Sequence, residues 1–254
     1  MSKSNAAQNI NGWIIIDKPT GMTSTAVVNK IKWACSARKA GHAGTLDPSA
    51  TGILAIALGE ATKTIPYVTE QIKSYTFEVK WGEATDSDDS DGKIIKTSQM
   101  RPSEQDIIAI LPRFRGEIKQ TPPFFSAVKI NGRRAYELAR SGEDFDIASR
   151  SLFVSSLKLE KYISENSAIL SLECGKGGYV RSIARDLGLE LGCYGHVKWL
   201  RRIASGSFNL SMAHSLDTIL KLNKTSAVNN FILPVELGLS TITVSYTHLR
   251  AHET

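Results

Sequence analysis

Residues 41–54 read GHAGTLDPSATGIL, a loop-like segment that runs into an apolar stretch. Proline disfavours the α region for the residue before it, so Pro48 biases Asp47 toward an extended or turn conformation. The glycines at 41, 44 and 52 allow tight bends and the close approach of a ligand to the backbone. The apolar residues after Gly52 can anchor this loop in a core. Asp47 is then a displayed carboxylate, able to act as a nucleophile or base, although an Asp-Pro pair is also a common turn.

The bulk composition is that of a globular protein with an anionic partner. The chain has 254 residues, of which 42% are hydrophobic and 22% charged. That length suits one large domain or two modest ones. The formal net charge is +6, and its sign favours nucleic acid over an acidic protein as partner, although simple solubility is an alternative explanation.

Cysteine usage and apolar runs bear on the cellular setting. Cys35, Cys174 and Cys193 are an odd number without a C-x-x-C pair, which argues against a disulfide framework and a structural zinc site. The four-residue apolar run before Asp17 is too short for a secretory signal. The longest apolar stretch, 53–58, is far too short to span a bilayer. We therefore expect a cytoplasmic protein that makes no membrane contact.

Hydrophobic periodicity predicts both helices and strands. Thr23 or Ser24 is a suitable N-cap for a helix with one apolar face. Residues 75–81 alternate with a period of two, which indicates a half-buried strand, and 168–174 form another strand candidate. The predicted elements that remain are a helix after the capping box Ser103–Asp106, an acidic turn at 84–92 expected to stay unpacked, and a helix with Val180, Ile183, Ala184 and Leu187 on one face. This order predicts an α+β fold.

Basic residues gather in three places. Residues 18–46 contain five Lys or Arg and no acid, and residues 113–140 contain seven against two glutamates. Lys198, Arg201 and Arg202 form the third cluster. Aromatic residues able to stack on unpaired bases lie beside them: Phe114, Phe124, Phe125, Tyr136 and Trp199. A solvated basic face is the structural alternative, but the combination favours RNA.

A second glycine-rich segment, CGKGGYVRSIARDLG (174–188), does not match a nucleotide-phosphate loop. That loop needs Gly-x-x-x-x-Gly-Lys followed by Ser or Thr. The segment instead offers Tyr179 and Arg181 at the start of a helix, where Arg181 can pair with a carboxylate or a phosphate. The structural alternatives are an ordinary ion pair for Arg181 and, for Tyr75, one more half-buried strand aromatic.

Six segments together resemble one enzyme family. GHAGTLDPSATGIL resembles the signature loop of the tRNA pseudouridine-55 synthases, in which the aspartate before proline is catalytic. The others are DKPTGMTS (17–24), SYTFEVKWGEATDSDDSDG (74–92), QTPPFFSAVKINGRRAYELARSG (120–142), and CGKGGYVRSIARDLG with WLRRIASGSF (199–208). The similarity spans residues 10–240 in the family's order.

The resemblance implies a fold and a site. The fold would be a mixed, largely antiparallel central sheet flanked by helices, with an RNA-contacting insertion. Asp47 would be the catalytic aspartate, Arg181 its ionic partner, and Tyr75 the tyrosine beneath the flipped base. The substrate-binding positions implied are His42, Tyr75, Tyr179 and Leu200. Lys18 and Pro19 are expected to belong to the scaffold.

The implied reaction is the isomerisation of uridine to pseudouridine at position 55, in the T loop of tRNA. The N1–C1′ bond breaks, the freed uracil rotates, and C5 bonds to C1′. No cofactor and no metal are expected. Asp47 could attack C1′, attack C6 or abstract a C2′ proton, and Arg181 would favour its ionised form. The expected partner is the T-arm of tRNA, bound by a monomer without an obligatory protein partner.

The resemblance also implies boundaries. Residues 10–240 would form the catalytic domain, with the RNA-contacting segment at about 113–150. Residues 241–254 match nothing expected, so the PUA-type module of bacterial relatives is expected to be absent or truncated. Two alternatives remain: a non-catalytic RNA-binding or tRNA-folding protein on the same scaffold, and a synthase for another RNA, perhaps under a guide RNA.

Overall fold

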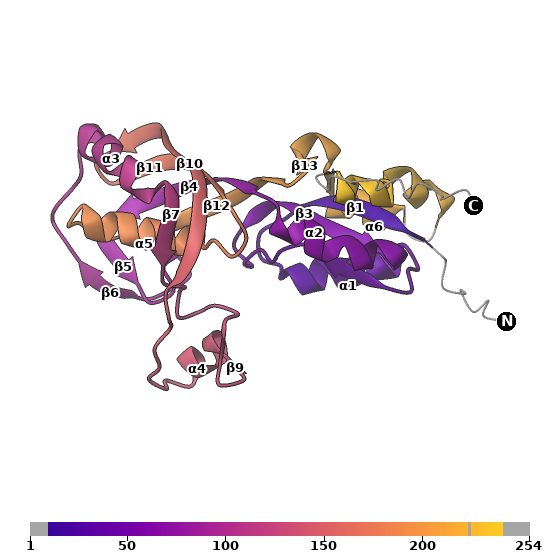
Figure 1. Cartoon of the computed structure of the whole chain (residues 1–254), viewed down its shortest axis with the longest axis horizontal. Helices are drawn as coiled ribbons and strands as arrows, with labels where there is room; N and C mark the ends of the chain where they lie inside the picture. Colours follow the sequence, from indigo (N-terminus) through magenta and orange to yellow (C-terminus); the bar gives the residue numbers. More distant parts are fainter. Residues whose placement is uncertain (1–9, 223–224, 241–254) are drawn as a thin grey trace, which may run out of the picture.

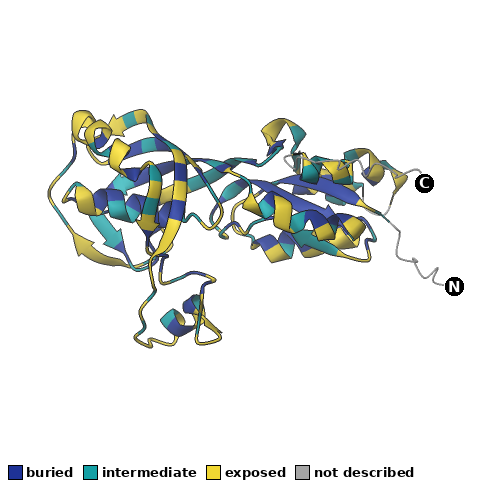
Figure 2. Cartoon of the chain, in the orientation of Figure 1, coloured by how far each residue is buried: buried dark blue, intermediate teal, exposed yellow. Residues whose placement is uncertain are grey.

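The structure is a computed structural model that describes residues 10–222 and 225–240. The expected tail at 241–254 lies outside these residues. Figure 1 shows an elongated molecule with two lobes. One is built around β1 (Gly12–Lys18) and β3 (Thr51–Leu58), and the other around β4 (Lys73–Trp81), β10 (Arg150–Ser164) and β11 (Ser167–Cys174). Figure 2 shows that the strands of the first lobe are largely buried, whereas exposed residues gather on the helices, the connecting loops and the outer strands of the second lobe.

One ten-stranded sheet runs through both lobes, in the order β14-β1-β3-β12-β4-β11-β10-β7, with β13 paired to β12 and β2 to β3. Its strands are β1 (Gly12–Lys18), β2 (Ala40–His42), β3 (Thr51–Leu58), β4 (Lys73–Trp81), β7 (Gly116–Gln120), β10 (Arg150–Ser164), β11 (Ser167–Cys174), β12 (Gly195–Ser205), β13 (Phe208–Asn209) and β14 (His214–Ser215). Among the paired strands described, β1 with β14 and β3 with β12 are parallel and the others antiparallel. The predicted α+β fold with a mixed, largely antiparallel sheet is confirmed.

Helices cover both lobes of this sheet. The α-helices are α1 (Ser24–Ala34), α2 (Ile65–Glu70), α3 (Glu104–Ile110), α4 (Ala135–Arg140), α5 (Val180–Glu190) and α6 (Leu216–Lys221). Five 3-10 segments accompany them, at Gly59–Thr64, Leu111–Phe114, Leu210–Met212, Ser226–Phe231 and Val235–Leu239. In the first lobe α1 and α6 pack on the sheet residues Ile14, Ile16 and Leu54. In the second, α5 packs its apolar face against Phe77 and Leu170.

Local sequence signals located α1, α3 and α5 correctly. Thr23 is the N-cap of α1, and its side chain accepts a hydrogen bond from the backbone of Ala26. Ser103 and Asp106 form the predicted capping box of α3. The predicted apolar face of α5 is buried. Caps and periodicity depend on residues within a few positions of one another, which explains why they are readable from sequence.

The prediction for the acidic turn was wrong. Residues 84–92 were expected to stay unpacked, yet Ser87, Asp88 and Asp89 are buried. They lie beyond β5 (Glu83–Thr85), which pairs with β6 (Ile94–Thr97). Their carboxylates can be buried because α5 brings two arginines to them, and charge pairing offsets the cost of removing a charge from water.

A small protruding unit interrupts the second lobe between β7 and β10. It contains β8 (Lys129–Ile130), β9 (Arg133–Arg134) and α4, and Figure 1 shows it hanging away from the sheet. β7 itself is an edge strand of the central sheet, paired with β10. The part of the 113–150 segment that stands apart is thus the chain between these two strands.

No helix within residues 10–222 and 225–240 is long and apolar enough to cross a membrane.

Candidate active site

The loop that carries Asp47 is tied to the first lobe on both sides. The hydroxyl of Ser24 donates to the carbonyl of Leu46 at 2.9 Å and accepts the Leu46 N–H at 2.8 Å. Lys18 Nζ donates to the Pro48 carbonyl at 3.1 Å. The Asp47 carbonyl accepts the N–H of Ala50 at 3.1 Å. Asp47 therefore does sit in a turn, and the turn presents its carboxylate.

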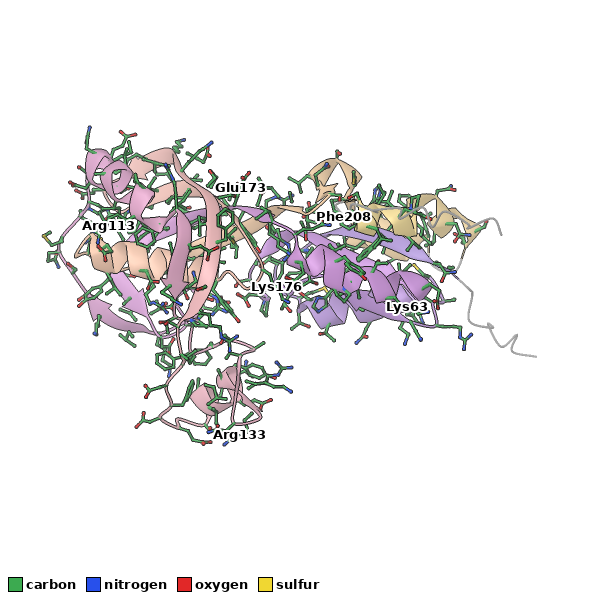
Figure 3. The ribbon with its side chains drawn as sticks, viewed as in Figure 1. Lys63, Arg113, Arg133, Glu173, Lys176 and Phe208 are labelled. Carbon is green, nitrogen blue, oxygen red and sulfur yellow. The ribbon has the colours of Figure 1, made fainter. Side chains whose placement is uncertain are left out.

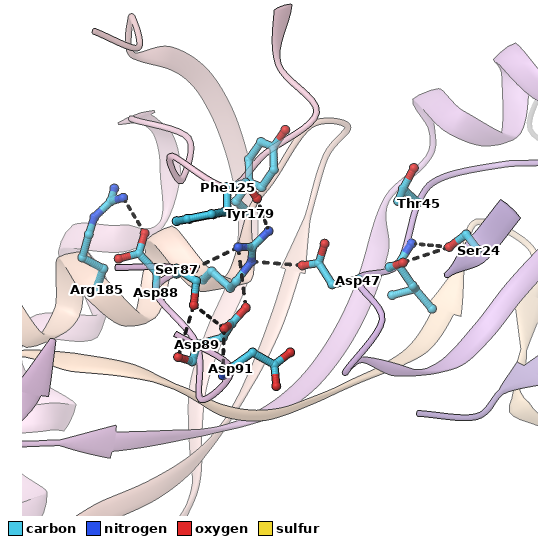
Figure 4. Close-up of polar contacts among 12 residues, drawn as sticks. Ser24, Thr45, Asp47, Ser87, Asp88, Asp89, Asp91, Phe125, Tyr179 and Arg185 are labelled. Carbon is cyan, nitrogen blue, oxygen red and sulfur yellow. Dashed lines mark hydrogen bonds and ion pairs between the residues drawn. The ribbon is translucent and has the colours of Figure 1, made fainter. Parts of the chain in front are cut away.

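Arg181 reaches this carboxylate from the second lobe. Its Nε lies 3.0 Å from Asp47 Oδ2, and the two side chains are 6% and 38% exposed. Its Nη1 donates to the Ser87 carbonyl at 2.9 Å and its Nη2 to the Phe125 carbonyl at 3.1 Å. Figure 4 shows Asp47 pointing toward the cluster formed by Ser87, Asp89 and Phe125. The predicted pairing of Asp47 with Arg181 is present in the structure.

A second carboxylate, Asp89, also faces Arg181 and was missed in the sequence. Its Oδ2 lies 3.6 Å from Arg181 Nη1. Next to it, Asp88 Oδ2 lies 2.9 Å from Arg185 Nη1. Burial raises the pKa of Asp89, and it raises that of Asp88 to about 6 against the opposing effect of Arg185. The i, i+4 spacing of the two arginines places them on one helix face and could have predicted an acidic partner.

A small cavity of about 30 Å³ opens beside the Asp47–Arg181 pair, which is room for little more than a water molecule. Residues from both lobes line it: Asp47, Ser49, Ala50, Asp89, Ser90, Asp91, Arg181, Val197, Lys198, Trp199 and Leu200. Leu200 is therefore brought to the pair, whereas His42, Tyr75 and Tyr179 are not among these lining residues. A nucleobase that enters this site must displace some of the residues that line the cavity.

Of the three other predicted site residues, Tyr75 and Tyr179 lie near enough to Asp47 for its charge to affect them, and His42 lies on the strand before the Asp47 loop. Tyr75 lies on β4 and is 8% exposed. Tyr179 is the N-cap of α5 and is fixed by Gln120, whose side chain accepts its N–H at 2.9 Å and donates to its carbonyl at 3.1 Å. Burial raises the pKa of both phenols, and the charge of Asp47 adds to each rise. His42 ends β2, half-buried, and burial lowers its pKa.

The third basic cluster of the sequence is not a free surface. Lys198 pairs with Glu78 at 2.9 Å, and Arg201 forms a two-point pair with Asp17 at 2.7 and 3.0 Å. Arg202 is 1% exposed. Phe114, expected to be able to stack on bases, is also buried in the core. Figure 3 shows that Arg133, by contrast, lies at the far end of the protruding unit.

Arg202 is the other residue that sequence reasoning did not assign to the site. Its Nε donates to the Ile53 carbonyl at 2.7 Å, and its Nη2 to the Gly44 carbonyl at 3.0 Å. These two hydrogen bonds hold both ends of the Asp47 loop, at Gly44 and at Ile53. The sequence shows Arg202 only as the last residue of the basic cluster that begins at Lys198, and no local signal distinguishes a buried arginine from an exposed one.

Comparison with known proteins finds one family along most of the chain. The model of the TruB family pseudouridylate synthase N-terminal domain matches residues 32–180, and that of the tRNA pseudouridylate synthase B C-terminal domain matches residues 181–240. The protein named tRNA pseudouridine synthase B of Ruegeria pomeroyi is 53% identical over 94% of this chain and 79% of its own length. Its namesake from Cereibacter sphaeroides is 54% identical over 94% and 80%.

Two solved structures share the fold. One is a Cbf5-Nop10-Gar1 complex, in which the matched chain is 28% identical with a TM-score of 0.68, over 89% of this chain and 61% of that one. The other is an H/ACA RNP bound to a substrate RNA containing 2′-deoxyuridine, with 26% identity, a TM-score of 0.66 and coverage of 89% and 60%. This chain thus spans about three fifths of the length of those solved chains.

Proposed function

This chain belongs to the TruB family of pseudouridylate synthases, and we propose that it converts uridine to pseudouridine at position 55 in the T loop of tRNA. The observation that carries the proposal is the Asp47–Arg181 pair, a half-exposed carboxylate held at 3.0 Å by a buried guanidinium. Such a pair keeps a carboxylate charged and oriented in a site that can exclude water.

The reaction requires that carboxylate beside the ribose and the base. The uridine leaves its stack, at a cost of a few kcal/mol, and enters between the lobes. The N1–C1′ bond breaks with Asp47 acting at C1′, at C6 or at the C2′ proton. The uracil then turns, C5 bonds to C1′, the C5 proton leaves to solvent, and N1 takes up a proton. The isomerisation therefore needs neither an oxidant nor a reductant.

The other predicted site residues have roles in binding the uridine and the RNA in this proposed reaction. Tyr75 lies beneath the base, where its ring can stack, and Tyr179 and Leu200 line the uridine pocket. His42 helps to hold the RNA from the Asp47 loop. The protruding unit within about 113–150 contacts the RNA through its exposed basic residues. We expect residues 10–240 to act as one catalytic domain, in the cytoplasm and as a monomer on the T-arm.

The high identity to bacterial proteins named for tRNA favours this substrate over another RNA. That identity is 53–54%, against 26–28% for the chains solved in ribonucleoprotein complexes. The joint presence of Asp47 and Arg181 in an ion pair argues against a purely RNA-binding protein, because binding alone requires no carboxylate at the site of a polyanion.

Tritium release tests the proposal. A T-arm stem-loop with 5-tritiated uridine at position 55 is expected to release tritium with the unaltered protein and none with Asp47→Asn. RNA affinity is expected to stay within about threefold, since few phosphate contacts change. Asp217→Asn, on the exposed side of α6, is the matched control and keeps full activity. Normal tritium release by Asp47→Asn would overturn the role of Asp47, and no release by the unaltered protein would overturn the function.

A further inference from the structure

Arg202 is a buried cation without an anionic partner. It is 1% exposed, and within the described residues it forms no ion pair. Its guanidinium donates instead to backbone carbonyls, Ile53 at 2.7 Å, Gly44 at 3.0 Å and Thr45 at 3.3 Å. A buried charge left without an opposite charge is costly, and carbonyl dipoles offset only part of that cost. Such an arrangement points to a use beyond packing.

The strand register puts Arg202 between the Asp47 loop and Tyr75. On β12, Arg202 is directly opposite Tyr75 of β4 and Gly52 of β3. Side chains of directly opposed residues lie on the same face of a sheet. Accordingly, the Tyr75 phenol lies close enough to the Arg202 guanidinium that this charge partly counters the rise that burial causes in the pKa of the phenol.

The backbone of β3 is pressed against Arg202. Gly52 has φ +98°, and a Cβ atom at this position would lie 2.1 Å from the Arg202 carbonyl oxygen. The loop can therefore approach β12 only through a glycine. This contact fixes the position of the Arg202 backbone, from which the guanidinium reaches the carbonyls of Gly44 and Thr45.

Other cations around Arg202 raise the positive charge beneath the loop. Burial lowers the pKa of Lys18 to about 8, opposed by Asp47 and reinforced by Arg202. Burial and then Arg202 lower the pKa of Lys73 to about 8. Asp47 is thus a carboxylate set over a buried positive centre, with Arg181 supplying a second positive charge from the opposite lobe.

We propose that Arg202 is a positioning residue for the isomerisation, which sets the Asp47 loop and the Tyr75 ring in one fixed relation across the uridine site. One guanidinium neighbours both, because it donates to carbonyls 44 and 45 and lies beside the Tyr75 phenol, its directly opposed residue on β4. This inference rests on the proposed function. A misplacement of about 1 Å at a reacting group costs about 100-fold in rate, so loss of this support acts on the chemical step.

Two substitutions separate charge from geometry. Arg202→Lys keeps the charge and loses the planar fork, whereas Arg202→Gln keeps a planar N–H donor and loses the charge. For each, the single-turnover rate at saturating enzyme and the affinity for the T-arm stem-loop are measured 10 °C below the variant's own unfolding midpoint. Arg101→Lys is the matched control, because Arg101 also donates to backbone carbonyls, those of Ser98 and Met100, and lies outside the segments assigned to RNA binding.

We expect both variants to lose about 100-fold in single-turnover rate and to keep their RNA affinity. If the geometry of the guanidinium matters more than its charge, Arg202→Lys is expected to react no faster than Arg202→Gln. Combining Arg202→Lys with Tyr75→Phe is expected to cost less than the sum of the two changes. A purely structural role predicts a lower unfolding midpoint with an unchanged rate per folded molecule, and that result overturns the proposal. Failure of both variants to fold, or rate and affinity falling together, also overturns it. An inactive unaltered protein would instead contradict the proposed function itself.

Discussion

The Nε atom of Arg181 lies 3.0 Å from the Oδ2 atom of Asp47, and the two residues come from opposite lobes. The arginine is buried and the aspartate is half-exposed. The cation is therefore held by protein groups, chiefly the carbonyls of Ser87 and Phe125, while the anion faces the space where a substrate would enter. Because the arginine is buried and the aspartate is accessible, the pair is suitable for chemistry at Asp47.

Arg181→Met is expected to weaken catalysis far more than binding. Loss of one preorganised charged donor typically costs about 10²–10³-fold in rate, whereas Arg181 is too buried to contribute much to phosphate binding. The single-turnover rate and the RNA dissociation constant are the measurements. Lys63→Met, which removes an exposed pair with Glu60 outside the segments assigned to RNA binding, is the control. Equal losses of rate and affinity would mean that Arg181 is only a phosphate contact.

Ser24→Ala is expected to lower both stability and rate. The Ser24 hydroxyl satisfies the N–H and the carbonyl of Leu46, next to Asp47, and unsatisfied buried groups cost about 1–3 kcal/mol. The neighbouring Thr23→Ala removes the N-cap bond of α1 and costs about 1 kcal/mol without disturbing the loop. Chemical denaturation and tritium release distinguish the two. If both variants lose stability alone, the Ser24 bridge does not position Asp47.

Gly52→Ala is expected to destabilise the protein more than Gly192→Ala. Both glycines have positive φ, +98° and +68°, but only at Gly52 would a Cβ meet backbone, at 2.1 Å. The conformational penalty common to both is about 1–2 kcal/mol, and the steric clash with β12 adds to it. Unfolding free energies of the two variants measure the difference. Equal values would show that β3 and β12 can separate at little cost.

Asp88 is expected to give an unusual pH dependence of stability. Its folded pKa is raised to about 6, mainly by burial, so the folded state binds the proton more tightly than the unfolded state. The stability contributed by this group therefore rises as pH falls through about 6, and the gain is complete near the ordinary carboxyl value of 3.8.

Comparison with Asp88→Asn isolates this effect from other carboxylates. The unfolding free energy of the unaltered protein minus that of the variant is expected to increase from pH 8 to pH 5. A difference that stays constant or decreases over this range would show that the pair with Arg185 outweighs burial.

Lys129→Ala is expected to weaken RNA binding without changing the saturated rate. Lys129 lies in the protruding unit, is exposed, and forms no ion pair within the residues described. Loss of one phosphate contact reduces the slope of log affinity against log salt by about 0.7–0.9. Lys63→Ala, which removes a residue already paired with Glu60, is the control. An unchanged salt slope would exclude this part of the 113–150 segment from the RNA contact.

Features that depend on neighbours in the chain were readable before the structure. The Asp47 turn follows from Pro48, the first turn of α1 from Thr23, and the position of Arg181 from the glycines before α5. The resemblance of ordered segments added the pairing of Asp47 with Arg181, which local physics alone could not supply.

Tertiary structure decided which charges are buried. Arg201 and Arg202 are adjacent and chemically identical, yet one pairs with Asp17 at the surface and the other is enclosed beneath the Asp47 loop. Successive residues of a strand point to opposite faces, but which face is buried depends on β3 and β4, strands distant in sequence. The same holds for Asp89, which is buried only because α5 brings Arg181 to it. The sequence alone therefore determined the carboxylate and its turn, whereas the meeting of the two lobes decided the charges that support it.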